Sequence, residues 1–284
     1  MEHKFKNIEQ SEYWNEKSGP KWVKLDDSLN ERFSILTDEL FNRASIKEGD
    51  CILDIGCGGG QTSYKAKMLV GLSGYVMGAD ISEAWLNFAR SKFSKTNNLE
   101  FNLCDVQTFK FNPNNFDKVI SKFGVMFFEN PVEAFQNIYL LMKSGGKITF
   151  VCWSSFFKNE FFTEGCNIIE NYTHEKLPKI TRDPGPFAFS EKDYINRILT
   201  SSGFKKIIID EVHTFICTKD TVENDTDILL NIGPRAKLLS NSNLSEEKMF
   251  ELRNKIWEFS EKREDLGIIS YKACLNYVSA CKWI

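Results

Sequence analysis

The feature that most constrains the fold of this chain is the stretch CILDIGCGGGQ, residues 51–61, in which four glycines fall within five residues behind an apolar run. Residues 51–55 have the pattern of a short buried strand, and residues 61–70 that of a helix. A strand that passes through a glycine-rich turn into a helix is a common α/β arrangement for bringing the backbone close to a ligand. The stretch therefore predicts an α/β protein with a ligand site beyond this strand.

Strand-like and helix-like segments alternate along the next hundred residues. Further strands are expected at 74–80, 99–105, 116–124 and 147–153, and helices at 82–93 and at 131–143 with a stop at Gly145–Gly146. This alternation predicts an α/β fold, a doubly wound three-layer αβα sandwich around a mostly parallel sheet. Two later strand-like segments, 205–213 and 268–284, would complete a seven-stranded sheet.

Composition and charge argue against several classes of protein. The 284 residues carry a net charge of −3, so the basic excess expected of a nucleic-acid-binding surface is missing. The apolar runs are far shorter than the ~20 residues of a membrane span, and residues 1–10 lack the apolar region of a secretory signal. None of the eight cysteines forms a C-x-x-C pair or stands at ligand spacing from a histidine. We therefore expect reduced thiols, no metal and a cytoplasmic location.

The glycine pattern separates the possible ligands. A dinucleotide fingerprint would need a third glycine at the position of Gln61, and a phosphate-binding P-loop would need a Lys-Ser/Thr pair that does not follow. The loop instead reads D-x-G-x-G-x-G from Asp54 to Gly60, and acids end the second and third strands at Asp80 and Asp105. This combination resembles the cofactor loop of class I S-adenosylmethionine-dependent methyltransferases. Acidic groups suit that cofactor, which carries an ammonium, a sulfonium and a ribose diol.

The resemblance implies a role for each predicted cofactor residue. Asp54 would help to orient the methionine ammonium, although it could also merely cap the turn. Asp80 would accept hydrogen bonds from the ribose hydroxyls, and Asp105 from the adenine amino group. The full predicted set is Asp54, Gly56, Cys57, Gly58, Gly60, Asp80, Ile81, Asp105, Val106, Ser121, Phe123 and Trp22. In this set Val106 donates its backbone N–H to the adenine, Ile81 stacks on it, and the backbone of Ser121 and Phe123 lines the methionine end.

The resemblance also suggests how the chain is divided. Residues 44–284 would form the methyltransferase domain, with an antiparallel last strand and cap insertions at about 154–190 and 217–267. Residues 1–43 would form an N-terminal helical lid segment that closes over the cofactor, with Trp14 or Trp22 near it.

Methyl transfer from a sulfonium is an in-line displacement that depends chiefly on alignment, so a general base is optional. The candidates for catalytic groups are His174 and Lys122, although a surface histidine and a solvated lysine would need no such role. The [ND]-P-P-[YF] motif of enzymes that methylate amino groups on DNA bases is replaced by SKFGVMFF at 121–128. Aromatic residues in the cap segments instead favour a small apolar or planar acceptor.

Other functions remain open at the level of sequence. An NAD(P)-dependent oxidoreductase would share the glycines and Asp80, and a non-catalytic binding subunit could keep the whole fold. A protein or lipid methyltransferase is a further alternative. The expected partners are the small-molecule substrate and no nucleic acid, without stable membrane insertion, in a monomer or homodimer.

Overall fold

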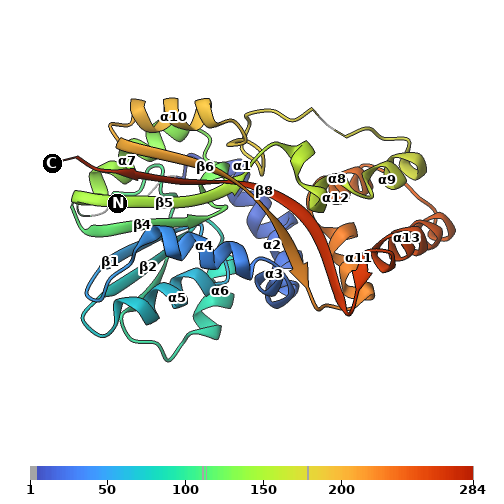
Figure 1. Ribbon diagram of the computed structural model, residues 1–284, viewed down its shortest axis with the longest axis horizontal. Coiled ribbons are helices and arrows are strands. Elements are labelled where there is room, and N and C mark those ends of the chain that lie inside the picture. The colour runs from blue at the N-terminus through green and yellow to red at the C-terminus, as the bar shows by residue number, and fades with distance from the viewer. Residues whose placement is uncertain (1–4, 111, 113, 178, 284) are drawn as a thin grey trace.

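The core of the protein is a twisted sheet. In the computed structural model, which describes residues 5–110, 112, 114–177 and 179–283, eight strands pair in the order β3-β2-β1-β4-β5-β8-β6, with β7 paired to β8 (Figure 1). The strands are β1 (Cys51–Ile55), β2 (Tyr75–Asp80), β3 (Leu99–Leu103), β4 (Phe116–Lys122), β5 (Met142–Trp153), β6 (Lys205–Thr218), β7 (Glu264–Asp265) and β8 (Ile268–Cys281). Strands β1 to β5 pair in parallel, and β8 is antiparallel to both β5 and β6. The predicted mostly parallel sheet with an antiparallel last strand is confirmed, and the two-residue β7 is an addition to it.

Helices cover both faces of the sheet. Figure 1 shows α4, α5 and α6 on one side and α7 and α10 on the other. The bounds in this part of the chain are α1 (Ile8–Glu12), the π-helix η1 (Tyr13–Lys17), α2 (Gly19–Lys24), α3 (Asp26–Arg32), α4 (Ser34–Ala44), α5 (Gln61–Val70), α6 (Glu83–Lys92), the 3-10 helix η2 (Val125–Phe127), α7 (Pro131–Leu141) and α10 (Lys192–Ser201). The helical N-terminal segment therefore comprises α1 to α4, and residues 1–4 of the predicted lid lie outside the described residues.

Local sequence explains where the central helices begin. The Ser82 hydroxyl accepts a hydrogen bond from the backbone N–H of Trp85 at the start of α6, and the Asn130 side chain does the same for Glu133 at the start of α7. The predicted end of α7 is wrong. The helix ends at Leu141 because Met142 already pairs with Phe116 in the sheet, so the glycine pair lies inside β5.

A second group of helices stands at one end of the sheet. Figure 1 shows β6 and β8, each 14 residues long, running out of the sheet into this group. Its members are the 3-10 helix η3 (Phe156–Lys158), α8 (Glu160–Thr163), α9 (Cys166–Thr173), α11 (Val222–Asn231), α12 (Gly233–Ser240) and α13 (Glu246–Glu261). We call these helices the cap. They lie within the two predicted insertions.

The main hydrophobic cluster joins the sheet to the cap. It runs from residues of the central strands, such as Val119 and Phe150, to Phe161 in α8 and Ile256 in α13. Continuous packing of this kind holds the cap against the carboxyl ends of the strands. Among the described residues, no helix combines the length and the apolar character needed to cross a membrane.

Candidate active site

A cavity of about 1050 Å³ lies between the carboxyl ends of the strands and the cap. Part of its wall is made by the glycine loop and by residues that end or follow β2 and β3, including Asp80 and Asp105. Another part of the wall is aromatic, with Trp153, Phe161 and Phe187 among its residues. This is the edge at which open parallel sheets bind their ligands, and the volume slightly exceeds the ~300–1,000 Å³ of small-molecule sites.

Two glycines in the loop are needed because other parts of the chain pack against them. A Cβ on Gly56 would lie 2.6 Å from the Cα of Gly124, which follows β4, and Gly56 has a φ of +65°. A Cβ on Gly59 would lie 2.6 Å from Oδ1 of Asp26, the first residue of α3. The loop is therefore held between the turn after β4 and the N-terminal helices.

Asp80, at the end of β2, is half-buried and faces the cavity. Its Oδ2 accepts a hydrogen bond from the backbone N–H of Gly58 (2.8 Å), and its Oδ1 accepts one from Ser82 (3.0 Å). Burial raises the pKa of the carboxyl, and these backbone donors partly offset the effect. Since a carboxylate oxygen can accept more than one hydrogen bond, both oxygens keep capacity for a pair of hydroxyls.

Asp54 lies beneath the loop and is fully buried. The hydroxyls of Thr62 and Ser63 each donate to its Oδ2 at 2.6 Å, whereas its Oδ1 has no partner among the described residues. Burial raises the pKa of this carboxyl to about 6. An unpartnered buried oxygen of this kind is a place for a water. Asp54 is not among the described residues that line the cavity.

Lys122, the last residue of β4, lines the cavity. Its Nζ lies 3.3 Å from Oδ1 of Asn30 and 3.4 Å from Oγ1 of Thr37, both long for hydrogen bonds. Burial lowers the pKa of this ammonium to about 8, against the attraction of Asp54 and Asp26. Lys122 therefore presents a cation to the cavity with hydrogen-bonding capacity to spare.

Asp105 has a different environment from the one predicted. Its Oδ2 accepts hydrogen bonds from the backbone N–H groups of Lys6 and Asn7, and its Oδ1 accepts from the Asn7 amide and the Gln107 N–H, all at 2.7–3.0 Å. The N-terminal segment thus occupies the carboxylate. A bond from this carboxylate to an adenine amino group would share it with Asn7, and that role stays a prediction.

The other predicted cofactor residues divide into two sets. Those that line the cavity are Gly56, Cys57, Gly58, Ile81, Val106, Phe123 and Trp22. Ser121 is fully buried, donates its hydroxyl to the Ile55 carbonyl (2.7 Å) and accepts from the Gly124 N–H (3.1 Å). The Ser121 hydroxyl thus holds the turn after β4 against β1. A contact of the Ser121 backbone with the methionine end of the cofactor stays a prediction. Gly60 lies behind the wall, because its Cβ position is filled by the ring of Phe101.

Phe123 has an unusual backbone for an aromatic residue, with a φ of +67°. Its ring stacks on Trp153 with centroids 4.6 Å apart, and the edge of Phe33 packs against it. The aromatic packing holds the strained residue in place. As a result, the chain turns sharply after Lys122 and the aromatic wall begins directly beside the glycine loop.

His174 lies away from this site. It follows α9 and borders a separate shallow depression with Tyr172 and Lys248, and it is absent from the cavity wall. The predicted catalytic role of His174 therefore has no support from the cavity wall and stays a prediction.

Sequence reasoning missed a buried polar cluster in which α3, β8 and the cap meet. The Arg32 guanidinium donates to Oδ1 of Asp225 (2.6 Å), and the Tyr271 hydroxyl donates to its Oδ2 (2.5 Å). Arg235 is also fully buried, and both guanidinium groups lie 5.7 Å from the ring of Phe161. One feature of the sequence could have revealed the cluster: Arg32 stands among the regularly spaced apolar residues of its helix.

Residues 46–203, more than half of the chain, match the protein family described as "Methyltransferase domain". The chain belongs to this methyltransferase family. Its fold is that of the class I S-adenosylmethionine-dependent enzymes, as the glycine loop predicted. The matched residues contain the glycine loop, β1 to β5, α10 and the cap helices η3, α8 and α9, whereas α1 to α4, β6 to β8 and the cap helices α11 to α13 lie outside them.

Curated relatives and solved structures resemble this chain at a distance. It is 28% identical over 130 residues to the ubiquinone/menaquinone biosynthesis C-methyltransferase UbiE of Klebsiella pneumoniae, covering 43% of this chain and 52% of that protein. It therefore spans about half the length of such relatives.

Two solved structures show the same fold. The protein BH2331 of Bacillus halodurans has a TM-score of 0.55 at 21% identity, covering 87% of this chain and 99% of that one. The phosphoethanolamine N-methyltransferase 2 of Haemonchus contortus, in complex with S-adenosyl-L-methionine, has a TM-score of 0.54 at 19% identity, covering 88% and 52%. At these identities the likeness establishes the architecture alone.

Proposed function

We propose that the protein moves a methyl group from S-adenosylmethionine to a small apolar or aromatic acceptor. The observation that carries this proposal is that the carboxylate of Asp80 and the aromatic residues Trp153, Phe161 and Phe187 line one cavity. The carboxylate has the chemistry for a ribose, and the aromatic residues have it for an apolar ring. A cavity of about 1050 Å³ leaves room for cofactor and acceptor side by side.

The residues around Asp80 and beneath the glycine loop fit the cofactor. The Asp80 oxygens, each held by one backbone N–H, would accept the ribose hydroxyls. The free Oδ1 of Asp54, behind the cavity wall, would attract the methionine ammonium through the loop backbone or a water. Lys122 would attract a carboxylate, either that of the cofactor or an acidic group of the acceptor. When bound, the cofactor supplies an electrophilic methyl group on a sulfonium.

The protein would contribute chiefly by alignment. An in-line displacement needs the acceptor atom, the methyl carbon and the sulfur on one line, and fixed positioning supplies as much as ~7–11 kcal/mol of a barrier. The stacked pair Phe123 and Trp153 would give a planar acceptor a rigid surface beside the glycine loop. No histidine is among the described residues that line the cavity, which agrees with a reaction that needs little base catalysis.

The first prediction tests the cofactor assignment. We expect S-adenosylhomocysteine to raise the melting temperature by several degrees, because a ligand at ~100 times its Kd stabilises by ~2.7 kcal/mol. NAD and NADP should leave it unchanged. In calorimetry, Asp80→Ala should weaken binding of S-adenosylhomocysteine by roughly 1.5–3 kcal/mol, the scale of hydrogen bonds to a charged group.

Glu83→Ala, on the exposed first turn of α6, is the matched control for Asp80→Ala and should bind normally. A shift with NAD alone would favour the oxidoreductase instead. A shift with S-adenosylhomocysteine but no turnover over a panel of quinone precursors, phenols and polyketides would favour a non-catalytic binding subunit.

The second prediction concerns pH. Because the pKa of Asp54 is about 6 in the free protein, its carboxyl is mostly neutral at about pH 5 and mostly ionised at about pH 7. We expect the affinity for S-adenosylhomocysteine to rise over this range, since only the carboxylate attracts an ammonium. Lys122 stays charged there, because its pKa is about 8.

Calorimetry of the wild type and Asp54→Asn between these pH values checks the expectation, and the variant should show a flatter profile. The stability of the folded protein should change with pH in the opposite direction to the affinity. A folded-state pKa above the usual 3.8 means that ionisation destabilises the empty protein as the pH rises through about 6. Asp54→Asn should therefore be at least as stable as the wild type at about pH 7. Equal pH profiles for the two proteins would contradict the role of Asp54.

A further inference from the structure

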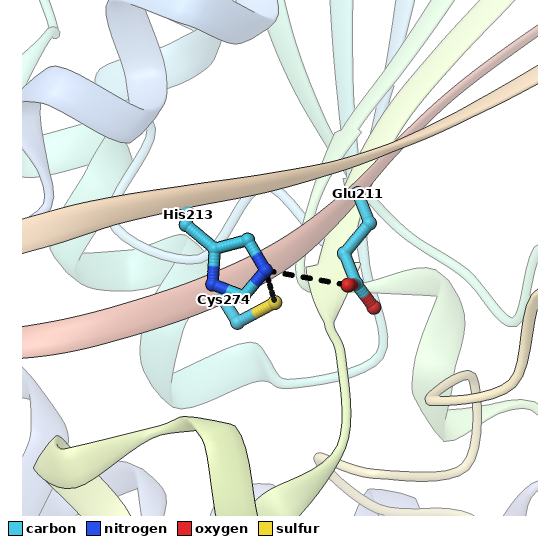
Figure 2. A group of neighbouring side chains, drawn as sticks. All are labelled: Glu211, His213 and Cys274. Atoms are coloured by element: carbon cyan, nitrogen blue, oxygen red, sulfur yellow. Dashed lines mark hydrogen bonds and ion pairs between the residues drawn. The ribbon is translucent and has the colours of Figure 1, made fainter.

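Three potential metal ligands meet on the two long strands that enter the cap. His213 in β6 stands directly opposite Cys274 in β8, and Glu211 lies two residues before His213 on the same face of β6 (Figure 2). None of the three lines the cofactor cavity. Because His213 and Cys274 are 61 residues apart in the sequence, this pairing has no short motif by which it could be recognised.

The distances fit a tetrahedral zinc ion. Sγ of Cys274 lies 3.7 Å from Nε2 of His213, and that nitrogen lies 3.4 Å from Oε1 of Glu211. All three ligand atoms fall within 4.8 Å of one another. With Zn–S of about 2.3 Å, and Zn–N and Zn–O of about 2.0–2.1 Å, a tetrahedron has S···N and N···O edges of about 3.6 and 3.3 Å. Small side-chain movements would bring all three atoms onto one ion.

Neighbouring groups hold two of these ligands in place. The Ser154 hydroxyl donates to Oε2 of Glu211 (2.9 Å), which leaves Oε1 turned toward the histidine. The backbone N–H of Cys274 donates to Oδ1 of Asn159 (2.8 Å), and its carbonyl accepts from the Ser154 N–H (3.0 Å). Hydrogen bonds that orient the ligands are a regular feature of protein metal sites.

The site is open on one side. Cys274 is buried and Glu211 is partly buried, whereas the His213 side chain is 69% exposed. An ion could therefore enter from solvent and keep a water as its fourth ligand.

Lys158 is the competitor for this position. Its Nζ donates to Oε1 of Glu211 at 2.8 Å, so an ammonium supplies the positive charge in the metal-free protein. The Lys158 side chain is 46% exposed and can turn into water when an ion replaces it.

We propose that Glu211, His213 and Cys274 form a site for a borderline-soft divalent cation such as Zn²⁺, which links β6 to β8. The Cys274 thiol loses its proton to water as the Sγ–metal bond forms, and no electron is transferred. The site is independent of the proposed methyl transfer.

The test uses Co²⁺ as a spectroscopic substitute for Zn²⁺ on the full chain. We expect one equivalent of Co²⁺ to give the absorption of a thiolate-to-cobalt bond, and Zn²⁺ to abolish it. Cys274→Ser should lose this absorption, and Cys217→Ser, which removes an exposed cysteine of the same β6, should keep it. His213→Gln changes an exposed side chain with little risk to folding, and should weaken Zn²⁺ binding at least tenfold in a chelator competition.

The variant Lys158→Met tests whether Glu211 is a ligand. Removal of the competing ammonium should tighten Zn²⁺ binding severalfold, whereas an unchanged or weaker affinity would mean that Glu211 is not a ligand. Absence of the thiolate absorption in the wild type, or its persistence in Cys274→Ser, would overturn the site. Equal Zn²⁺ affinity in wild type and His213→Gln would do the same. None of these results depends on the binding of S-adenosylhomocysteine, so the metal site and the proposed methyl transfer are tested independently.

Discussion

Replacing Asp225 by alanine should destabilise the protein by about 3–5 kcal/mol, the usual cost of removing one partner from a buried ion pair. Asp225 is fully buried and accepts hydrogen bonds from Arg32 and Tyr271. Without it, the guanidinium groups of Arg32 and Arg235 would both remain buried beside Phe161, and Arg32 would lose its counterion. Arg32 belongs to α3 and Asp225 to α11, so the N-terminal helices should loosen from the cap.

Urea unfolding of three variants measures this effect. The matched control is Asp227→Ala, two residues along the same helix, whose half-exposed salt bridge to Arg253 should contribute only about 0–1 kcal/mol. A double variant, Arg32→Met with Asp225→Leu, removes both charges and should recover a large part of the loss. A loss for Asp225→Ala no larger than that for Asp227→Ala would contradict the assigned role of the cluster.

Replacing Gly56 by alanine should cost roughly 2–5 kcal/mol and weaken cofactor binding more than tenfold. Left-handed backbone accounts for about 1–2 kcal/mol of this, and overpacking for about 1–3 kcal/mol. The added Cβ would lie 2.6 Å from the Cα of Gly124, and since backbone meets backbone there, no side chain can turn aside. The glycine loop and the turn after β4 would have to separate.

Gly145 is the matched control for this experiment. It has a similar φ of +76°, but nothing lies within 4 Å of its Cβ position. Gly145→Ala should therefore lose only the left-handed preference, about 1–2 kcal/mol, and should bind S-adenosylhomocysteine normally. Urea unfolding and calorimetry on both variants separate backbone strain from steric contact. Equal losses of stability and binding would mean that the approach to Gly124 has no importance.

The central fold could be predicted because its signals are local. The bounds of β1 and α5 match the predicted 51–55 and 61–70, since an apolar strand, a glycine turn and a helix occupy one continuous stretch. Asp80 could be placed at the cavity because the carboxyl ends of parallel strands share one edge. The family followed from the same residues.

The position of Ser121 could not be predicted in this way. Strand β4 is buried on both faces, so its apolar residues run without the alternation that would show which side chains turn inward. Only the three-dimensional fold shows that its hydroxyl holds the turn after β4 in place.

The sequence by itself determined the order of strands and helices, the glycine loop and the acid that ends β2, because each depends on residues close together in the chain. The tertiary structure alone decided the contacts between distant segments. These include Asn7 on Asp105, Arg32 on Asp225 and His213 beside Cys274. Such pairs are 61 to 193 residues apart, and their partners are chosen by how the N-terminal helices, the cap and the long strands pack together. No periodicity along the chain encodes that packing, because it depends on the shapes of whole elements rather than on neighbouring residues.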